Sequence, residues 1–106
     1  MKKIACQWVF IAAALIAAGA SAQHTVAQKD KQFAPNDLTV KVGETATFSN
    51  DDPYLHNVFS MSEAKTFDLG NFPSGEVRSV TFDQPGTVDV DGTIHPLMNM
   101  TITVEE

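Results

Sequence analysis

The sequence is poor in several residue types, and each shortage excludes a class of protein. It has one cysteine, Cys6, so it forms no internal disulfide. Only 7 lysine and arginine residues stand against 13 aspartate and glutamate residues, which gives a formal net charge of −6. That balance leaves no basic face for nucleic acid, which we exclude as a partner. The sequence also lacks a glycine-rich phosphate loop and a nucleophile motif, so we predict no catalytic residues and no enzymatic activity.

The first 22 residues have the composition of a secretory signal peptide. Two lysines follow the initiating methionine, residues 9–18 form an apolar run, and residues 20–22 read Ala-Ser-Ala, a small-residue cleavage site. The apolar run is too short to anchor the chain across a bilayer. We therefore predict a signal peptide over residues 1–22 and a single mature domain over residues 23–106. The mature protein is expected in the periplasm, with no membrane association after cleavage.

Removal of the signal peptide leaves an 84-residue domain with few means of stabilisation. It has 5 basic residues against 13 acidic ones, a net charge of −8, and it has lost both Cys6 and the only tryptophan, Trp8. A domain of this size has a thin hydrophobic core. Because no disulfide is available, a bound metal is one remaining source of stability, and close packing of β-sheets is the other.

Apolar and polar residues alternate with the period of a β-strand through most of the mature chain. The segments that alternate in this way, or that are rich in β-branched residues, are 38–42, 45–49, 58–59, 77–82, 87–90 and 100–104. The Gly-Glu pair at 43–44 and the Pro-Gly pair at 85–86 predict turns. Residues 23–28 are polar and predict a loose start, and residues 62–65 predict a single helical turn. Seven or eight short strands are typical of an all-β sandwich or barrel.

Two histidines and a methionine are the candidates for metal chemistry. His56 lies where a predicted loop meets a strand, and a lone histidine of this kind is more often structural than a ligand. His95 and Met98 are more specific because they form a His-x-x-Met motif directly after a strand. Imidazole and thioether both suit copper, and this spacing lets the two side chains reach one ion from a tight loop. Pro96 restricts the loop, which lowers the entropy lost when the ligands are held.

A series of short motifs runs through the mature chain in a recognisable order. The first group is Phe33-Ala34-Pro35, Leu38-Thr39-Val40, Gly43, Thr47-Phe48-Ser49-Asn50 and His56-Asn57-Val58. The second group is Thr81-Phe82-Asp83, Pro85-Gly86-Thr87 and Ile94-His95-Pro96-Leu97-Met98. From about residue 29 to residue 104 the chain resembles the cupredoxin family, above all the plastocyanin-like and amicyanin-like proteins associated with methylamine utilisation. The resemblance implies a two-sheet antiparallel Greek-key β-sandwich that holds one copper ion near one end and transfers electrons in the periplasm.

The resemblance also implies a set of copper ligands. The family takes one ligand from a histidine followed by asparagine, which His56 and Asn57 match. The other three come from a Cys-x-x-His-x-x-Met loop, in which His95 and Met98 match the histidine and the methionine. The cysteine position falls on Gly92, which has no side-chain ligand. The expected metal ligands are therefore His56, His95 and Met98, a set that suits Cu(I) and holds Cu(II) if a further ligand completes the shell.

Three other side chains are candidates for that further ligand, namely Asp91, Met61 and Met100. Met98 and Met100 share one face if the chain between them is extended. For Asn57 the resemblance leaves two alternatives. Its side chain either links the two ligand loops by hydrogen bonds or belongs to a solvated turn.

Three functions are compatible with these features. The first is a periplasmic copper-binding protein suited to copper carriage or atypical redox chemistry, with a redox or copper-trafficking protein as its partner. The second is an ordinary electron-transfer cupredoxin, against which Gly92 argues because the thiolate is missing. The third is a metal-free sandwich that serves as a binding module, against which the joint presence of His56, His95 and Met98 argues. We therefore favour the first.

Overall fold

The computed structural model describes residues 22–106. The predicted signal peptide falls on residues 1–21 and Ala22, so almost all of it lies outside the described residues. Within the described part of the chain, no helix is long and apolar enough to cross a membrane.

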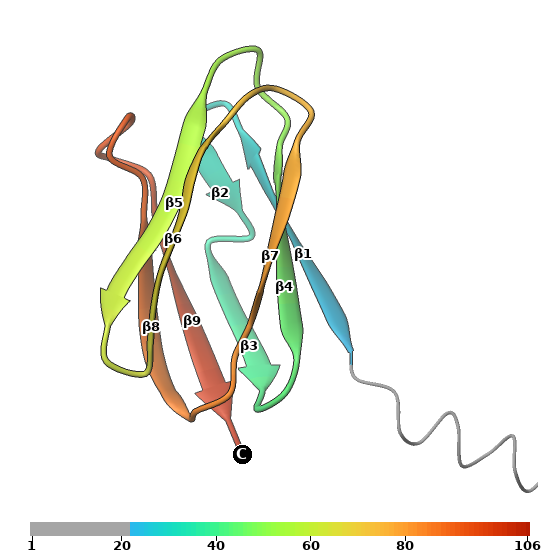
Figure 1. Ribbon diagram of the computed structural model, residues 1–106, viewed down its shortest axis with the longest axis vertical. Coiled ribbons are helices and arrows are strands. Elements are labelled where there is room, and N and C mark those ends of the chain that lie inside the picture. Colours follow the sequence, from blue (N-terminus) through green and yellow to red (C-terminus); the bar gives the residue numbers. More distant parts are fainter. Residues whose placement is uncertain (1–21) are drawn as a thin grey trace, which may run out of the picture.

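Nine β-strands in residues 22–106 form two sheets that pack face to face (Figure 1). Their bounds are β1 (Gln23–Lys29), β2 (Gln32–Ala34), β3 (Asp37–Lys41), β4 (Thr45–Asn50), β5 (His56–Ser62), β6 (Lys65–Phe72), β7 (Val77–Thr81), β8 (Gly86–Asp91) and β9 (Asn99–Glu105). One sheet has the strand order β2-β1-β4-β7, and the other has the order β3-β9-β8-β5-β6. Two neighbouring pairs, β1 with β4 and β3 with β9, are parallel.

The predicted all-β sandwich is confirmed, with several differences in detail. The described chain has nine strands rather than seven or eight, and its two parallel pairs make both sheets mixed rather than wholly antiparallel. The loose start predicted for residues 23–28 is wrong, because Gln23–Lys29 forms β1. The inward side chains at the end of this strand are Val26 and Gln28, both 0% exposed, and the buried glutamine conceals the alternation.

The helical turn predicted for residues 62–65 is also wrong. Ser62 and Lys65 are paired residues that close the hairpin between β5 and β6. The turn predicted at 43–44 is present. Gly43 has a φ of +95°, a conformation that glycine adopts without steric cost, and the backbone N–H of Glu44 donates to the carbonyl of Lys41 at 2.9 Å.

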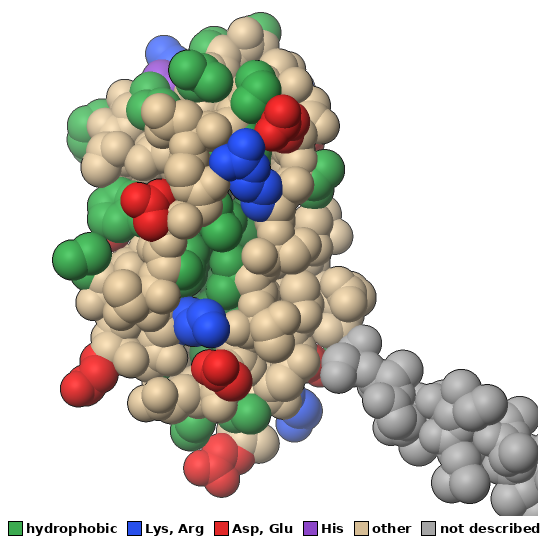
Figure 2. Space-filling model, in the orientation of Figure 1, with side chains coloured by type: hydrophobic (Ala, Val, Ile, Leu, Met, Phe, Trp, Pro, Cys, Tyr) green, Lys and Arg blue, Asp and Glu red, His purple; other side chains and the backbone are tan. Residues whose placement is uncertain are grey.

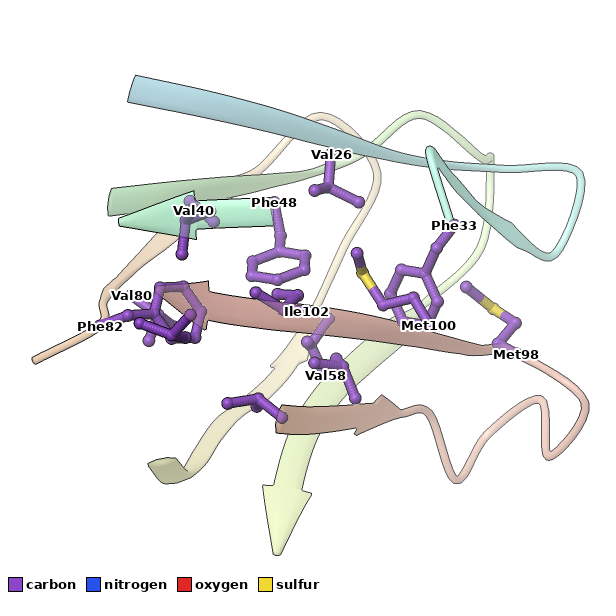
Figure 3. Packing of buried hydrophobic residues seen from close by; sticks show 14 of the residues in the cluster. Val26, Phe33, Val40, Phe48, Val58, Val80, Phe82, Met98, Met100 and Ile102 are labelled. Carbon is purple, nitrogen blue, oxygen red and sulfur yellow. The ribbon is translucent and has the colours of Figure 1, made fainter. Parts of the chain in front are cut away.

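The hydrophobic core lies between the two sheets (Figure 3). Phe48 of β4 and Ile102 of β9 meet near its centre from opposite sheets, and both are fully buried. Full burial of a side chain of this size contributes roughly 1.5–3 kcal/mol. The other buried apolar residues are Val26, Phe33, Val40, Ala46, Val58, Phe72, Val80, Phe82, Val88, Val90, Met98, Met100 and Val104.

The β6–β7 turn and three other connections lie at one end of the sandwich, at the top of Figure 1, and these three concern the candidate ligands. The three are the β1–β2 turn at residues 30–31, the β4–β5 loop at residues 51–55 and the β8–β9 loop at residues 92–98. The β3–β4 turn lies at the opposite end. The sandwich therefore brings together loops that are distant in the sequence, and the candidate ligands lie among them.

Candidate metal centre

His56 is the first residue of β5 and is only 1% exposed. Its Nε2 lies 2.7 Å from Oδ2 of Asp52, which is itself buried. The same carboxylate accepts the backbone N–H groups of Asp30 at 2.8 Å and Lys31 at 3.1 Å. Asp52 therefore connects the imidazole to the β1–β2 turn, whose two residues both have positive φ.

The protonation of Asp52 determines which nitrogen of His56 is free. Burial alone would raise the pKa of this carboxyl, but the hydrogen bonds from His56 and from the backbone of Asp30 and Lys31 outweigh it and lower the pKa to about 2. The ionised carboxylate only accepts hydrogen bonds, so Nε2 of His56 carries the proton and donates. Nδ1 then keeps its lone pair, which is the arrangement found in metal-binding histidines that are oriented by a carboxylate.

His95 lies in the β8–β9 loop, and its ring is close to that of His56. The two ring centroids are 5.0 Å apart and the ring planes are inclined by 68°. Nε2 of His95 is buried and has no hydrogen-bond partner in the described part of the chain. A buried polar atom without a partner is costly, and a bound metal ion at this position would satisfy it.

Met98 ends the same loop and is 1% exposed. Its backbone N–H donates to the carbonyl of His95 at 2.9 Å, and its own carbonyl accepts the N–H of Gly92 at 3.2 Å. One backbone hydrogen bond therefore joins the two ends of the Gly-x-x-His-x-x-Met segment, and the other closes a turn within its second half. Met98 and Met100 are both buried, as expected if they share one face, and Figure 3 shows both at the end of the core nearest the loops.

The other candidate ligands are placed less favourably. Met61 is 79% exposed and lies five residues along β5 from His56, about 16 Å at the usual rise of a strand. Asp91 alternates with the buried Val90 and Gly92, so its side chain lies on the outer face of β8. Neither residue joins the histidine pair.

Asn57 links the two ligand segments, which settles the alternatives left open by the sequence. Its Nδ2 donates to Oγ1 of Thr93 at 2.7 Å, and its Oδ1 accepts the backbone N–H groups of Thr93 at 2.9 Å and Ile94 at 3.2 Å. These three bonds join the start of β5 to the start of the β8–β9 loop. The residue after His56 therefore fixes the position of the loop that carries His95.

Gly92 is buried at the start of this loop, and its φ lies outside the left-handed region. A Cβ atom at this position would lie 3.0 Å from the carbonyl oxygen of Asn57 and 3.8 Å from Cβ of Met98. A side chain here would thus start between the two segments that carry the candidate ligands. The backbone accepts an L-residue, at the cost of a small shift of the Asn57 carbonyl.

The donor set fits copper. No group of three His, Cys, Asp or Glu side chains suited to a metal occurs within residues 22–106, so a third ligand has to come from another residue type. Two imidazoles and a thioether are ligands that copper accepts and that hard cations such as Mg²⁺ and Ca²⁺ do not favour. The unpartnered His95 nitrogen and the buried Met98 supply donors of this kind.

Residues 20–105 match the sequence family described as copper binding proteins of the plastocyanin/azurin family. The chain belongs to this family. Its cofactor is copper, and its fold is the cupredoxin sandwich.

Individual relatives agree with this assignment. The chain is 38% identical to chloroplastic plastocyanin of Oryza sativa subsp. indica over 89 residues, which cover 72% of this chain and 57% of the relative. It is 41% identical to chloroplastic plastocyanin of Hordeum vulgare over 64 residues, which cover 52% of this chain and 41% of the relative. The chain therefore spans only about half the length of these two relatives.

Solved structures show the same fold. A reduced amicyanin variant superposes with a TM-score of 0.73 at 28% identity, covering 84% of this chain and 88% of amicyanin. A copper-containing nitrite reductase from Thermus scotoductus superposes with a TM-score of 0.75 at 27% identity, covering 80% of this chain but only 23% of the enzyme. The likeness to amicyanin thus extends over most of that protein, and the likeness to the enzyme is confined to about a quarter of it.

Two residues near the cupredoxin histidines were not recognised from the sequence. Asp52 stands in an Asp-Asp-Pro segment that reads as a solvated turn, and its burial depends on partners 21 and 22 residues away. The only local signal is its spacing of four residues before His56. No sequence pattern assigns a role to Tyr54, whose ring contacts both imidazoles.

Apolar side chains surround the end of the sandwich where the histidines lie. Figure 2 shows hydrophobic side chains gathered at the upper end and the left edge of the face in view. The exposed apolar residues of the two ligand loops are Tyr54, Leu55, Ile94 and Leu97. Leu97 is the most exposed of them at 93%.

Proposed function

We propose that this chain is a periplasmic copper-binding protein of cupredoxin fold that carries copper through a site without a thiolate. The proposed ligands are His56, His95 and Met98. The observation that carries the proposal is the pair of imidazoles with ring centroids 5.0 Å apart, one anchored by Asp52 and the other with a buried unpartnered nitrogen. The predicted signal peptide over residues 1–22 supports the location.

The proposed ligands favour copper in its reduced state. Bound copper would supply a redox-active cation, whose oxidation state changes between Cu(I) and Cu(II). The imidazoles of His56 and His95 serve both oxidation states, whereas the thioether of Met98 is soft and prefers Cu(I). Gly92 supplies no thiolate, so the strong covalent ligand of a blue-copper site is absent from this position. That loss favours carriage over ordinary electron transfer.

Copper titration of histidine variants tests the proposed site. We expect His56→Ala and His95→Ala each to weaken Cu(I) binding by about 100-fold or more, because a ligand matters at least as much as the residues that support it. His24→Ala is the matched control, since His24 lies at the start of β1 and its Nε2 contacts Glu44 at 2.8 Å. Binding constants are measured by competition with a chromophoric Cu(I) chelator. Equal losses in all three variants would contradict the proposed site.

The role of Met98 is tested by the difference between oxidation states. Met98→Leu keeps the apolar volume and removes sulfur, so it should weaken Cu(I) binding by about tenfold and leave Cu(II) binding nearly unchanged. Met100→Leu is the control, because Met100 is also buried and lies two residues further along the chain. A similar loss of Cu(I) affinity in both variants would point to general repacking of the core. Tight Cu(I) binding by Met98→Leu would remove Met98 from the ligand set.

Copper titration identifies the metal-free alternative, and the rate of electron exchange with a redox partner identifies the electron-transfer alternative. A protein that binds neither Cu(I) nor Cu(II) would be a metal-free sandwich. A protein that binds copper and exchanges electrons rapidly with a redox partner would be an electron-transfer cupredoxin despite Gly92.

A further inference from the structure

The ring of Tyr54 completes a cluster of three rings with the two histidines. Its centroid lies 5.5 Å from that of His56, with an interplanar angle of 67°, and 5.3 Å from that of His95, with an angle of 66°. Both are edge-to-face contacts, the geometry that aromatic rings prefer. With the 5.0 Å separation of the imidazoles, each ring therefore contacts the other two.

The two histidines are held in different ways. The buried imidazole of His56 is oriented by its hydrogen bond to Asp52. For His95, the described part of the chain provides no partner to the buried Nε2, and the recorded ring contacts are those with His56 and Tyr54. The orientation of the His95 ring thus depends on packing more than on hydrogen bonding, and Tyr54 provides one of its two aromatic contacts.

Tyr54 is itself held firmly enough to support another ring. The buried Asn50 donates from Nδ2 to the backbone carbonyl of Tyr54 at 2.8 Å and to the carbonyl of Phe72 at 3.0 Å. The Nζ of Lys31 lies 5.6 Å from the centroid of the Tyr54 ring, within the range of a cation–π contact. The residue is 36% exposed, so its ring lies between the buried imidazole of His56 and solvent.

We infer that Tyr54 is a positioning residue that holds His95 against His56 and sets the rate at which copper leaves the site. This inference rests on the proposed function, because it assumes that the two histidines bind copper. The aromatic ring performs the role, since both contacts are made by ring edges and faces. The phenolic hydroxyl is not required for either contact.

The rate of copper release tests the inference. Cu(I)-loaded protein is mixed with excess chelator, and transfer is followed by stopped-flow absorption. Tyr54→Leu should release copper about tenfold faster, because it removes two aromatic contacts of the kind that each contribute a few-fold to tenfold. Tyr54→Phe should stay within about twofold of the unsubstituted protein. Leu55→Ala alters a neighbouring exposed side chain of the same loop and should also stay within about twofold.

A second measurement needs no copper. In the metal-free protein, Tyr54→Leu should shift the ring-proton NMR signals of His95 more than those of His56, because Asp52 still orients His56. Tyr54→Phe should leave both sets close to their original positions. Because Tyr54 is on an exposed loop, these variants should fold, and chemical denaturation checks that they do.

Several results would overturn the inference. One is copper release from Tyr54→Leu at the rate of the unsubstituted protein. Another is an acceleration of release in Leu55→Ala equal to that in Tyr54→Leu. A third is that the His95 ring-proton signals do not shift in metal-free Tyr54→Leu. Failure of the proposed function is recognised separately, by copper binding that survives both His56→Ala and His95→Ala. In that case the NMR measurement still decides whether Tyr54 positions His95.

Discussion

Copper-loaded Gly92→Cys protein is expected to be intensely blue, whereas the unsubstituted protein with Cu(II) is expected to be nearly colourless. A thiolate bound to Cu(II) in a plane with two imidazoles, with a weak axial methionine, is the arrangement of a blue-copper site. The proposed ligands His56, His95 and Met98 correspond to the other three ligands of that arrangement. The substitution therefore adds the one donor of that arrangement that Gly92 does not supply to the proposed site.

The structure favours this outcome because position 92 accepts a side chain. Its φ lies outside the left-handed region, and a Cβ atom there would lie 3.8 Å from Cβ of Met98. The 3.0 Å approach to the carbonyl oxygen of Asn57 requires a shift of a few tenths of an ångström, which we expect to cost about 1–2 kcal/mol. The folded variant should thus present its sulfur near the proposed ligands.

Gly92→Ser is the matched control for the colour. It places the same Cβ atom against Asn57 and a side chain of similar size, but it carries no thiolate. Absorption spectra after one equivalent of Cu(II) should show the intense visible band in Gly92→Cys alone. A folded, copper-bound Gly92→Cys protein without that band would mean that position 92 does not face the copper, and an intense band in the unsubstituted protein would contradict the proposed ligand set.

The fold was largely predictable because its central strands alternate clearly. Segments such as 45–49 and 100–104 alternate buried apolar residues with threonine or serine on the opposite face, and both form strands of the core, β4 and β9. The alternation did not predict β1, because the buried position before the β1–β2 turn is occupied by the polar Gln28. It also failed for β6, whose charged residues and glycine interrupt the hydrophobic alternation at the edge of a sheet.

The candidate site was predictable only in part. His95 and Met98 were predicted from residue type and spacing and His56 from the resemblance to the family, and the structure brings the two histidine rings together. The supporting residues could not be identified in that way. Asp52 and Tyr54 acquire their roles from contacts across three connections, and such contacts depend on the tertiary packing of the β1–β2 turn and two loops.

Asp52→Ala is expected to destabilise the metal-free protein by about 2–4 kcal/mol. The substitution removes the acceptor of three hydrogen bonds, leaving the buried Nε2 of His56 and two partly buried backbone N–H groups without that partner. A domain of this size has a total stability of only about 5–15 kcal/mol, so the loss is a large share of it. Asp51→Ala, at the exposed neighbouring position, should change the stability by less than about 0.5 kcal/mol. Urea denaturation of the metal-free proteins measures both, and equal stabilities would contradict the structural role of Asp52.

The Asp52→Asn variant distinguishes two roles of the Asp52 side chain, which stabilises the fold and orients the His56 ring. Oδ1 of Asp52 accepts the N–H of Asp30, and Oδ2 accepts both the N–H of Lys31 and Nε2–H of His56. Because an amide has one oxygen and one NH₂ group, either orientation of the asparagine sets a donor against a donor. If the NH₂ group faces His56, the imidazole relieves the conflict by moving its proton to Nδ1, which removes the lone pair that a metal requires.

We therefore expect Asp52→Asn to lose less stability than Asp52→Ala and still to bind Cu(I) about 10–100-fold more weakly than the unsubstituted protein. The NMR signals of the His56 ring nitrogens should report the change of tautomer directly. Copper affinity equal to that of the Asp51→Asn control would show that the carboxylate supports the loop without orienting the ligand. Weak Cu(I) binding together with an unchanged His56 tautomer would place the effect in the β1–β2 turn. There the amide of asparagine has one acceptor oxygen for the backbone N–H groups of Asp30 and Lys31, whereas the carboxylate has two.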